Sequence, residues 1–189
     1  MPISQIVTNS IASGQTITSP TIVTPTMAGS VLTLGTTQAS TSGTSINFTS
    51  IPSWVKRVTV MFNSVSLSGT AVIRVQLGVS GTPETTGYLS GSGAIAASNT
   101  VVFQSSTAGI DMYGADAAYR LNGSLVFTTM GSNVWTFMGN TFNSPATSTS
   151  YVQTTAGSKT LAGTLDMVRI TSSNGTDTFD NGSINILYE

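Results

Sequence analysis

The sequence predicts an all-β protein, an antiparallel, jelly-roll-like β-sandwich over residues 41–189 that is preceded by an extended N-terminal arm over residues 1–40. Short segments alternate apolar and polar residues with the period of two that is typical of half-buried strands. Gly-, Asn- and Ser-rich turns separate these segments, and the best helical window, 114–121, predicts one turn of helix at most. The first 55 residues carry no charged side chain, which fits neither an ordinary core nor an ordinary solvated tail.

The predicted arm repeats a loose unit of Thr, Pro and β-branched residues, as in "TSPTIVTPTM" at 18–27. Pro20 and Pro25 each remove a backbone donor and restrict the preceding residue to extended conformations. Ile and Val recur along the arm, whereas disordered tails usually carry more charge and less β-branched apolar content. We therefore expect an extended arm that gains order by contact with neighbouring chains, and plain disorder is the alternative.

The predicted sandwich opens with two clearly alternating strands. In "VKRVTVMFNSV" at 55–65, Val58, Val60 and Phe62 share one face, and "TAVIRVQLG" at 70–78 alternates in the same way. Further strands are expected at 101–104, 121–129, 133–138, 150–154, 164–171 and 183–188. Many short strands with Gly-rich turns and without helices indicate a sandwich or jelly roll.

The carboxyl terminus, "SINILYE" at 183–189, also has the pattern of a strand. Ile184, Ile186 and Tyr188 fall on one face, as in a strand that packs one side against a core. We expect this end to be paired within the sheet rather than to trail as a tail.

Composition and charge exclude several classes of function. Only 7% of the residues are charged and the net charge is −1, so no long-range field favours nucleic acid or anionic lipid. The chain has no His and no Cys, which removes the commonest general base, the commonest transition-metal ligand and thiolate chemistry. No secretion signal and no run of about 18–20 apolar residues is present. We expect a soluble protein made in a cytosol, with no cofactor.

Two blocks of the chain resemble a module that ends many tail-fibre and other virion proteins of tailed bacteriophages. These blocks are "TSINFTSIPSWVKRVTVMF" at 44–62 and "TLDMVRITSSNGTDTFDNGSINILYE" at 164–189. The charge-free Thr/Pro/Ile repeat also resembles the amino-terminal stretches of those proteins. The resemblance is specific at the two blocks, which cover about forty-five residues, and loose from 80 to 160. No catalytic residue carries over from the module.

The resemblance implies a non-enzymatic virion protein with a β-sandwich head, made in the host cytoplasm. The first expectation is a short tail fibre or tail-associated protein, a homotrimer anchored to other virion proteins by its arm. The alternative is a capsid decoration, or cement, protein that stabilises the head shell. A polysaccharide-degrading enzyme is the third and least favoured class.

Aromatic side chains are the candidate ligand contacts, because flat apolar rings with hydroxyl and amide neighbours suit a host surface glycan. Tyr88, Tyr113 and Tyr119 are the preferred sites, since they lie in predicted Gly-rich loops and loops carry recognition on a rigid sandwich. For each of them a role in packing is the competing interpretation. Trp54, Trp135 and Tyr151 are weaker candidates, and Trp135 occupies a strand position that is more typical of the core.

Other clusters point to chemistry only weakly. The loop "NGTDTFDNG" at 174–182 offers oxygen ligands for Ca²⁺, but its two Asn-Gly pairs are typical of tight turns, which we favour. Asp111 and Asp116 resemble the paired carboxylates of a glycosidase in type alone, and loop residues paired with Arg120 are the preferred interpretation. Without His, a Ser-His-Asp triad is impossible. We therefore predict no catalytic residue and no metal site.

Overall fold

The structure, a computed structural model, describes residues 32–114, 116–117, 119–144 and 149–189. These residues form two antiparallel sheets, and the described part of the chain contains no helix and hence none able to cross a bilayer. The larger sheet consists of β1 (Thr33–Leu34), β2 (Gln38–Ala39), β4 (Arg57–Leu67), β7 (Tyr88–Ala96), β8 (Val101–Ser106), β10 (Arg120–Gly131), β11 (Val134–Ser144), β12 (Tyr151–Thr160) and β14 (Phe179–Tyr188). The smaller sheet consists of β3 (Ser45–Phe48), β5 (Ile73–Val79), β6 (Thr82–Pro83), β9 (Ile110–Met112) and β13 (Met167–Ser172).

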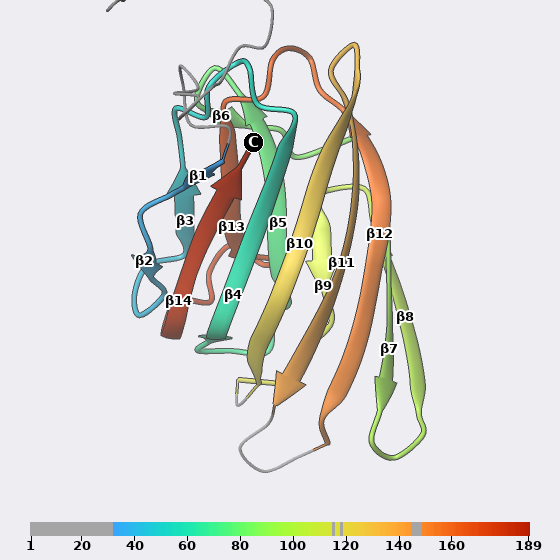
Figure 1. Ribbon diagram of the computed structural model, residues 1–189. Helices are drawn as coiled ribbons and strands as arrows, with labels where there is room; N and C mark the ends of the chain where they lie inside the picture. Colours follow the sequence, from blue (N-terminus) through green and yellow to red (C-terminus); the bar gives the residue numbers. More distant parts are fainter. Residues whose placement is uncertain (1–31, 115, 118, 145–148) are drawn as a thin grey trace, which may run out of the picture. The chain divides into compact units, whose positions relative to one another are not determined.

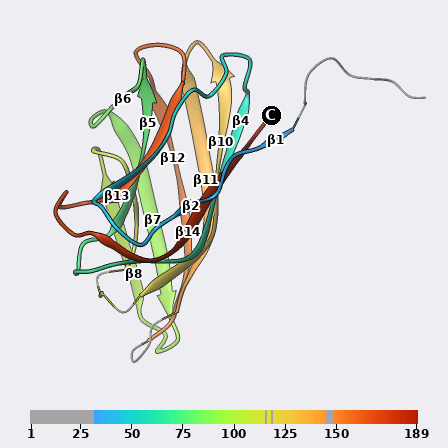
Figure 2. The ribbon, with the colours of Figure 1, turned by 90° about the vertical axis from the view of Figure 1, so that its left-hand side faces the viewer.

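The two sheets pack face to face around one apolar core, with the larger sheet in front in Figure 1 and both layers visible in Figure 2. Val58, Val60 and Phe62 point inward from the larger sheet, and Val75 and Leu77 point inward from the smaller one; each is at most 5% exposed. Burial of such side chains contributes about 1.5–3 kcal/mol each. The predicted all-β, antiparallel sandwich is confirmed.

The strand order brings distant parts of the chain together. The larger sheet runs β1-β14-β4-β10-β11-β12-β7-β8, with β2 also paired to β14, and the smaller runs β3-β13-β5-β6, with β9 paired to β5. The blocks 44–62 and 164–189 therefore meet in both sheets, because β3 pairs with β13 and β4 pairs with β14. The middle of the chain supplies the β10–β11–β12 meander and the β7–β8 hairpin at the far edge.

The C-terminal strand β14 lies inside the larger sheet, as the alternation predicts. It pairs with β4 on one side and with β1 and β2 on the other. Ile184 is 0% exposed and Ile186 is 3% exposed, and Tyr188 packs partly buried against the same core. The end of the chain is therefore a paired strand that contributes to the core.

Most of the predicted arm, residues 1–31, lies outside the described residues. Its last part belongs to the larger sheet, because β1 and β2 both pair with β14. The backbone N–H of Gly35 donates to the carbonyl oxygen of Ile186 at 2.7 Å, and that of Ser40 donates to Gly182 at 3.0 Å. The sandwich thus begins about eight residues earlier than the boundary at residue 41 expected from the sequence.

Strand β7 contains "GSGA" at 91–94, a Gly- and Ser-rich segment of the kind from which the sequence predicts turns, and for this segment that prediction is wrong. The segment is extended and pairs with β12 and β8 along its length. Gly91 lies on the outward side of the sheet, and a Cβ placed there would lie 3.1 Å from the ring of Phe103 on β8. The glycine therefore makes room for an aromatic ring on the neighbouring strand, a cross-strand arrangement known to stabilise glycine-containing sheets.

Candidate functional site

Three tyrosines cluster at the end of the sandwich where β9, β10 and β12 meet. Tyr113 directly follows β9, Tyr119 directly precedes β10 and Tyr151 begins β12. The ring of Tyr151 packs edge-on against Tyr113 at 5.0 Å between centroids and against Tyr119 at 5.5 Å. Such pairs stabilise a fold by about 0.5–1.5 kcal/mol each. Two of the three predicted site residues, Tyr113 and Tyr119, therefore pack against the same third ring, and all three rings of the cluster are half-buried.

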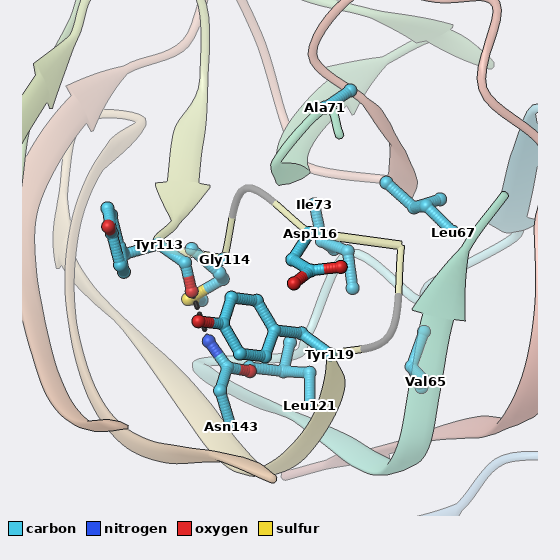
Figure 3. A pocket seen from close by; sticks show the side chains of 11 residues that line it. Val65, Leu67, Ala71, Ile73, Tyr113, Gly114, Asp116, Tyr119, Leu121 and Asn143 are labelled. Carbon is cyan, nitrogen blue, oxygen red and sulfur yellow. Dashed lines mark hydrogen bonds between the residues drawn. The ribbon is translucent and has the colours of Figure 1, made fainter. Parts of the chain in front are cut away.

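Beside the tyrosine cluster lies a very small cavity (Figure 3). Asn143 holds its wall, because its side-chain amide donates to the backbone carbonyl of Tyr113. The apolar lining comes from Val65, Leu67, Ile73, Met112 and Leu121. The cavity volume is only about 10 Å³, room for about one water molecule. No sugar ring fits inside it, so a glycan in contact with these tyrosines would have to lie on their outer edges.

Tyr88 is not a surface residue, and its prediction as a loop contact is wrong. It begins strand β7 and is 0% exposed. Its hydroxyl accepts a hydrogen bond from the backbone N–H of Leu77 at 2.7 Å and lies 3.3 Å from the carbonyl oxygen of the same residue. Burial raises the pKa of Tyr88 well above its usual value. The side chain joins the two sheets through the core and offers no face to a ligand.

A buried cation lies beside Tyr88. The Lys159 ammonium is 2.5 Å from a carboxylate oxygen of Glu84 and 5.3 Å from the centre of the Tyr88 ring. Burial alone would raise the pKa of Glu84, but hydrogen bonds from Lys159 and from the backbone N–H of Ala162 lower it below its usual value. The ion pair between Glu84 and Lys159 therefore links the turn after β6 to the end of β12, and the Lys159 ammonium is occupied by this carboxylate and the Tyr88 ring.

The two carboxylates that the sequence singles out, Asp111 and Asp116, lie in different surroundings. Asp111 lies on β9, where its carboxylate accepts two hydrogen bonds from Arg74 of β5. Asp116 lines the small cavity. The expected partner of Asp111, Arg120, is replaced by Arg74, because the β5–β9 pairing sets Arg74 directly opposite Asp111.

The first part of the loop 174–182 is a turn, as predicted, whereas residues 179–182, with the second Asn-Gly pair, belong to strand β14. The side-chain oxygen of Asn174 accepts from the backbone N–H groups of Thr176 and Asp177, both at 3.0 Å. Asp177 in turn accepts from the backbone N–H of Ala71, whereas Asp180 bonds to the hydroxyl of Ser66. The two carboxylates thus serve different backbone segments, and the described residues contain no group of three acidic side chains that could hold a metal ion.

The predicted role of Trp135 in the core is confirmed, since it is 4% exposed. It lines an open hollow of about 420 Å³ beside the β10–β11 turn, together with Lys56 and Leu165. The buried indole has no free face for stacking on a sugar. Trp54 is 48% exposed, and the centre of its ring lies 6.0 Å from the centre of the Tyr188 ring.

The most unusual surface of the described chain is one that the sequence analysis missed. On the outward side of β11, β12, β7 and β8, four apolar side chains lie opposite one another in a row: Phe142, Val152, Ile95 and Val101. Phe103 and Met138 extend this row along the strands, and the six side chains are between 42% and 74% exposed. We call these six residues the outer apolar face. Monomeric proteins rarely expose contiguous apolar surface of this kind.

The inward side of the same strands is polar behind this row, the reverse of the usual arrangement, whereas Trp135 and Tyr88 elsewhere on β11 and β7 face the apolar core. Thr141 and Gln153 face each other behind Phe142 and Val152, and Ser92 and Thr155 form the next row; each is at most 5% exposed. The Ser92 hydroxyl donates to the carbonyl oxygen of Asp111 at 2.6 Å, and it lies 2.9 Å from the hydroxyl oxygen of Thr155. In a one-sided sheet the apolar residues normally face the core. This inversion explains why alternation alone did not reveal which side of 101–104 and 150–154 faces outward.

Comparisons with protein-family models, with curated proteins and with solved structures find no match for this chain.

Proposed function

We propose that the chain is a non-enzymatic structural protein of a tailed-phage particle, a short tail fibre or tail-associated protein that works through contacts with other protein chains. The outer apolar face carries this proposal. Its four strands contain one charged residue, Lys159, and that side chain points inward and is 6% exposed. A charge-free apolar sheet face of several strands is a surface for protein contact.

The sequence resemblance supports the same proposal through its position in the fold. The two resembling blocks, 44–62 and 164–189, are side by side in both sheets. The outer apolar face lies in the opposite half of the larger sheet, in the region where the resemblance is loose. We therefore propose that the two resembling blocks form a framework shared with the phage module. The strands that carry the outer apolar face would make the contacts particular to this chain.

The remaining parts of the proposal concern assembly. The chain forms a homotrimer in the virion, and residues 1–31 attach it to other virion proteins. Extended arms with Thr, Pro and β-branched residues bind by adding backbone hydrogen bonds and apolar contacts to a neighbour.

Labelling of virus particles tests the proposal. An antibody raised against the purified chain should bind purified particles of the phage that encodes it, in a few copies at the tail. Label spread over the shell would assign the alternative, capsid decoration. Particles that carry neither label nor peptides of the chain by mass spectrometry would overturn a structural role in the virion.

A host glycan is a second candidate partner, favoured by the clustering of Tyr113 and Tyr119 around Tyr151. A glycan array probed with the full chain should give a signal that Tyr119→Ala abolishes and Tyr88→Phe leaves unchanged, because Tyr88 is buried. An array signal that both variants retain would remove the tyrosine cluster as the binding site.

A further inference from the structure

We propose that the outer apolar face is the surface through which copies of this chain bind one another. The inference rests on the proposed function in taking this face as an assembly surface, and it names the partner as a second copy of the chain. Five observations lead to it.

The first observation is the inverted polarity of the strands. Phe142 and Val152 point outward, whereas their chain neighbours Thr141 and Gln153 are 5% and 1% exposed inside the sandwich. Among the residues that the structure describes, the side-chain oxygens of Thr141 and Gln153 have no hydrogen-bond partner. A register shift of one residue would exchange the two sets, so the polar residues are inward at a cost. The cost is offset if the outward apolar set is buried in an assembly.

The second observation is the size of the face. Four strands spaced about 4.8 Å apart and about nine residues long cover roughly 600 Å² in projection, and the side chains make the accessible area larger. Each partner in a stable protein complex typically buries about 800 Å². The outward side of the four strands, of which the outer apolar face is a part, is therefore close to the size that an interface needs.

The third observation is the free edge beside the face. Strand β8 pairs with β7, and it forms the end of the larger sheet in the described structure. Its sequence, "VVFQSS", has no charge and no proline, and its register with β7 shows no bulge. Such an edge invites pairing with another strand. The opposite edge is different, because the short strands β1 and β2 cover β14.

The fourth observation is charge. A partner with many ionisable groups would have to desolvate them against an apolar surface, which costs free energy. A second copy presents the same charge-free face, because Lys159 points inward, so the contact desolvates no charge. The fifth is the contrast with the outer side of the smaller sheet, where Arg74, Asp111 and Arg169 lie on neighbouring strands. The outer apolar face presents no charged side chain of this kind.

Solution mass of the full chain and of matched variants tests the inference. By light scattering at micromolar concentration, the protein should have a mass of two or more 19.4 kDa chains. Ile95→Asp, at a side chain 58% exposed on the face, should reduce it to one chain. Leu34→Asp, 62% exposed at the opposite edge, should leave the assembly intact. A monomeric wild-type protein, or an Ile95→Asp variant with the wild-type mass, would overturn the inference.

Cross-linking gives a second test that does not depend on the folding of a charged variant. The chain has no Cys, so Val101→Cys introduces a single thiol, at a site 71% exposed on β8. A short bismaleimide should join two chains into a covalent dimer, and Leu34→Cys should give none. Absence of dimer from Val101→Cys would count against the face. Particle labelling separates this inference from the proposed function. An assembled chain that is absent from particles refutes the virion role and leaves the interface, whereas a monomer that is present in them refutes the interface and the homotrimer and leaves the virion role.

Discussion

Arg74 and Asp111 form a bidentate ion pair between strands β5 and β9 of the smaller sheet. The Arg74 Nε lies 2.6 Å from one carboxylate oxygen of Asp111, and Nη2 lies 2.8 Å from the other. The two residues are direct neighbours on β5 and β9, and their side chains are only 17% and 12% exposed. The hydrogen bonds to Asp111 raise the pKa of Arg74 above its usual value. The pair holds the short strand β9 in place, and β9 leads directly into Tyr113.

Replacement of Asp111 should therefore destabilise the fold. Asp111→Asn keeps the shape but leaves the Arg74 charge half-buried without its partner, which should lower the free energy of unfolding by about 2–3 kcal/mol. Urea unfolding followed by circular dichroism measures this. Glu189→Gln is the control, because it breaks the exposed Arg57–Glu189 pair, which should be worth less than about 1 kcal/mol. Equal losses in the two variants would contradict the structural role of Asp111.

A second prediction concerns Tyr88, whose hydroxyl should stabilise the fold rather than contact a ligand. Tyr88→Phe keeps the buried ring and removes the hydroxyl that accepts from the Leu77 N–H, which should cost about 1–3 kcal/mol. Tyr113→Phe is the matched control: its half-buried ring packs on Tyr151, and loss of its hydroxyl should change stability by less than about 0.5 kcal/mol. Thermal unfolding of both variants distinguishes them. An unchanged Tm for Tyr88→Phe would mean that the hydrogen bond contributes nothing.

The Glu84–Lys159 pair should make stability depend on pH in the acid range. The pKa of Glu84 is lower in the folded state than its usual value of 4.5, so the unfolded chain binds the proton more readily. The stabilisation that the ionised Glu84 contributes is fully present above pH 4.5, and it is lost as the pH falls through the pKa of Glu84 in the folded state. Glu84→Gln should therefore be less stable than the wild type at pH 7, and the difference should shrink toward pH 3. A difference in Tm that stays constant from pH 7 to pH 3 would contradict this linkage.

Strands with large alternating side chains were predictable, because a period of two is visible wherever apolar residues face one core. Val58, Val60 and Phe62 on β4, and Ile184 and Ile186 on β14, are of this kind. Strand β7 was not predictable in this way, since its inward side carries Ser90 and Ser92 and its outward side carries glycines. Gly-rich segments normally indicate turns, and here tertiary pairing on both sides overrides that tendency.

The candidate site was predictable in part, for a related reason. Tyr113 and Tyr119 are close in sequence, and their position near a loop could be inferred. Their contact with Tyr151 depends on the pairing of β12 between β11 and β7, which no local pattern reveals. Tyr88 has the same Gly- and Ser-rich sequence neighbourhood as a loop tyrosine. Only the β7 pairing shows that it faces the core.

Limited proteolysis should locate the N-terminal boundary of the sandwich. Because Thr33–Leu34 and Gln38–Ala39 pair with β14, we expect a resistant core that starts close to residue 32 rather than at 41. Trypsin is unsuitable, since the first Lys or Arg is Lys56, so a protease of broad specificity such as subtilisin is needed. Mass spectrometry identifies the new terminus. A core that starts beyond residue 40 would mean that β1 and β2 do not protect the chain in solution.

Deletion of the last strand should be far more costly than deletion of the arm. Removal of residues 183–189 takes away Ile184 and Ile186, each worth about 1.5–3 kcal/mol, from a fold whose net stability is typically about 5–15 kcal/mol. It also leaves much of one side of β4 without its backbone partner and removes the strand to which β1 and β2 attach. The product should be insoluble or should unfold at a markedly lower temperature.

Residues 1–20 lie outside all these pairings, so their deletion should leave the Tm unchanged and abolish incorporation into particles. A C-terminal truncation that melts like the intact protein would refute the role of β14, and an arm deletion that still assembles would refute attachment through the arm.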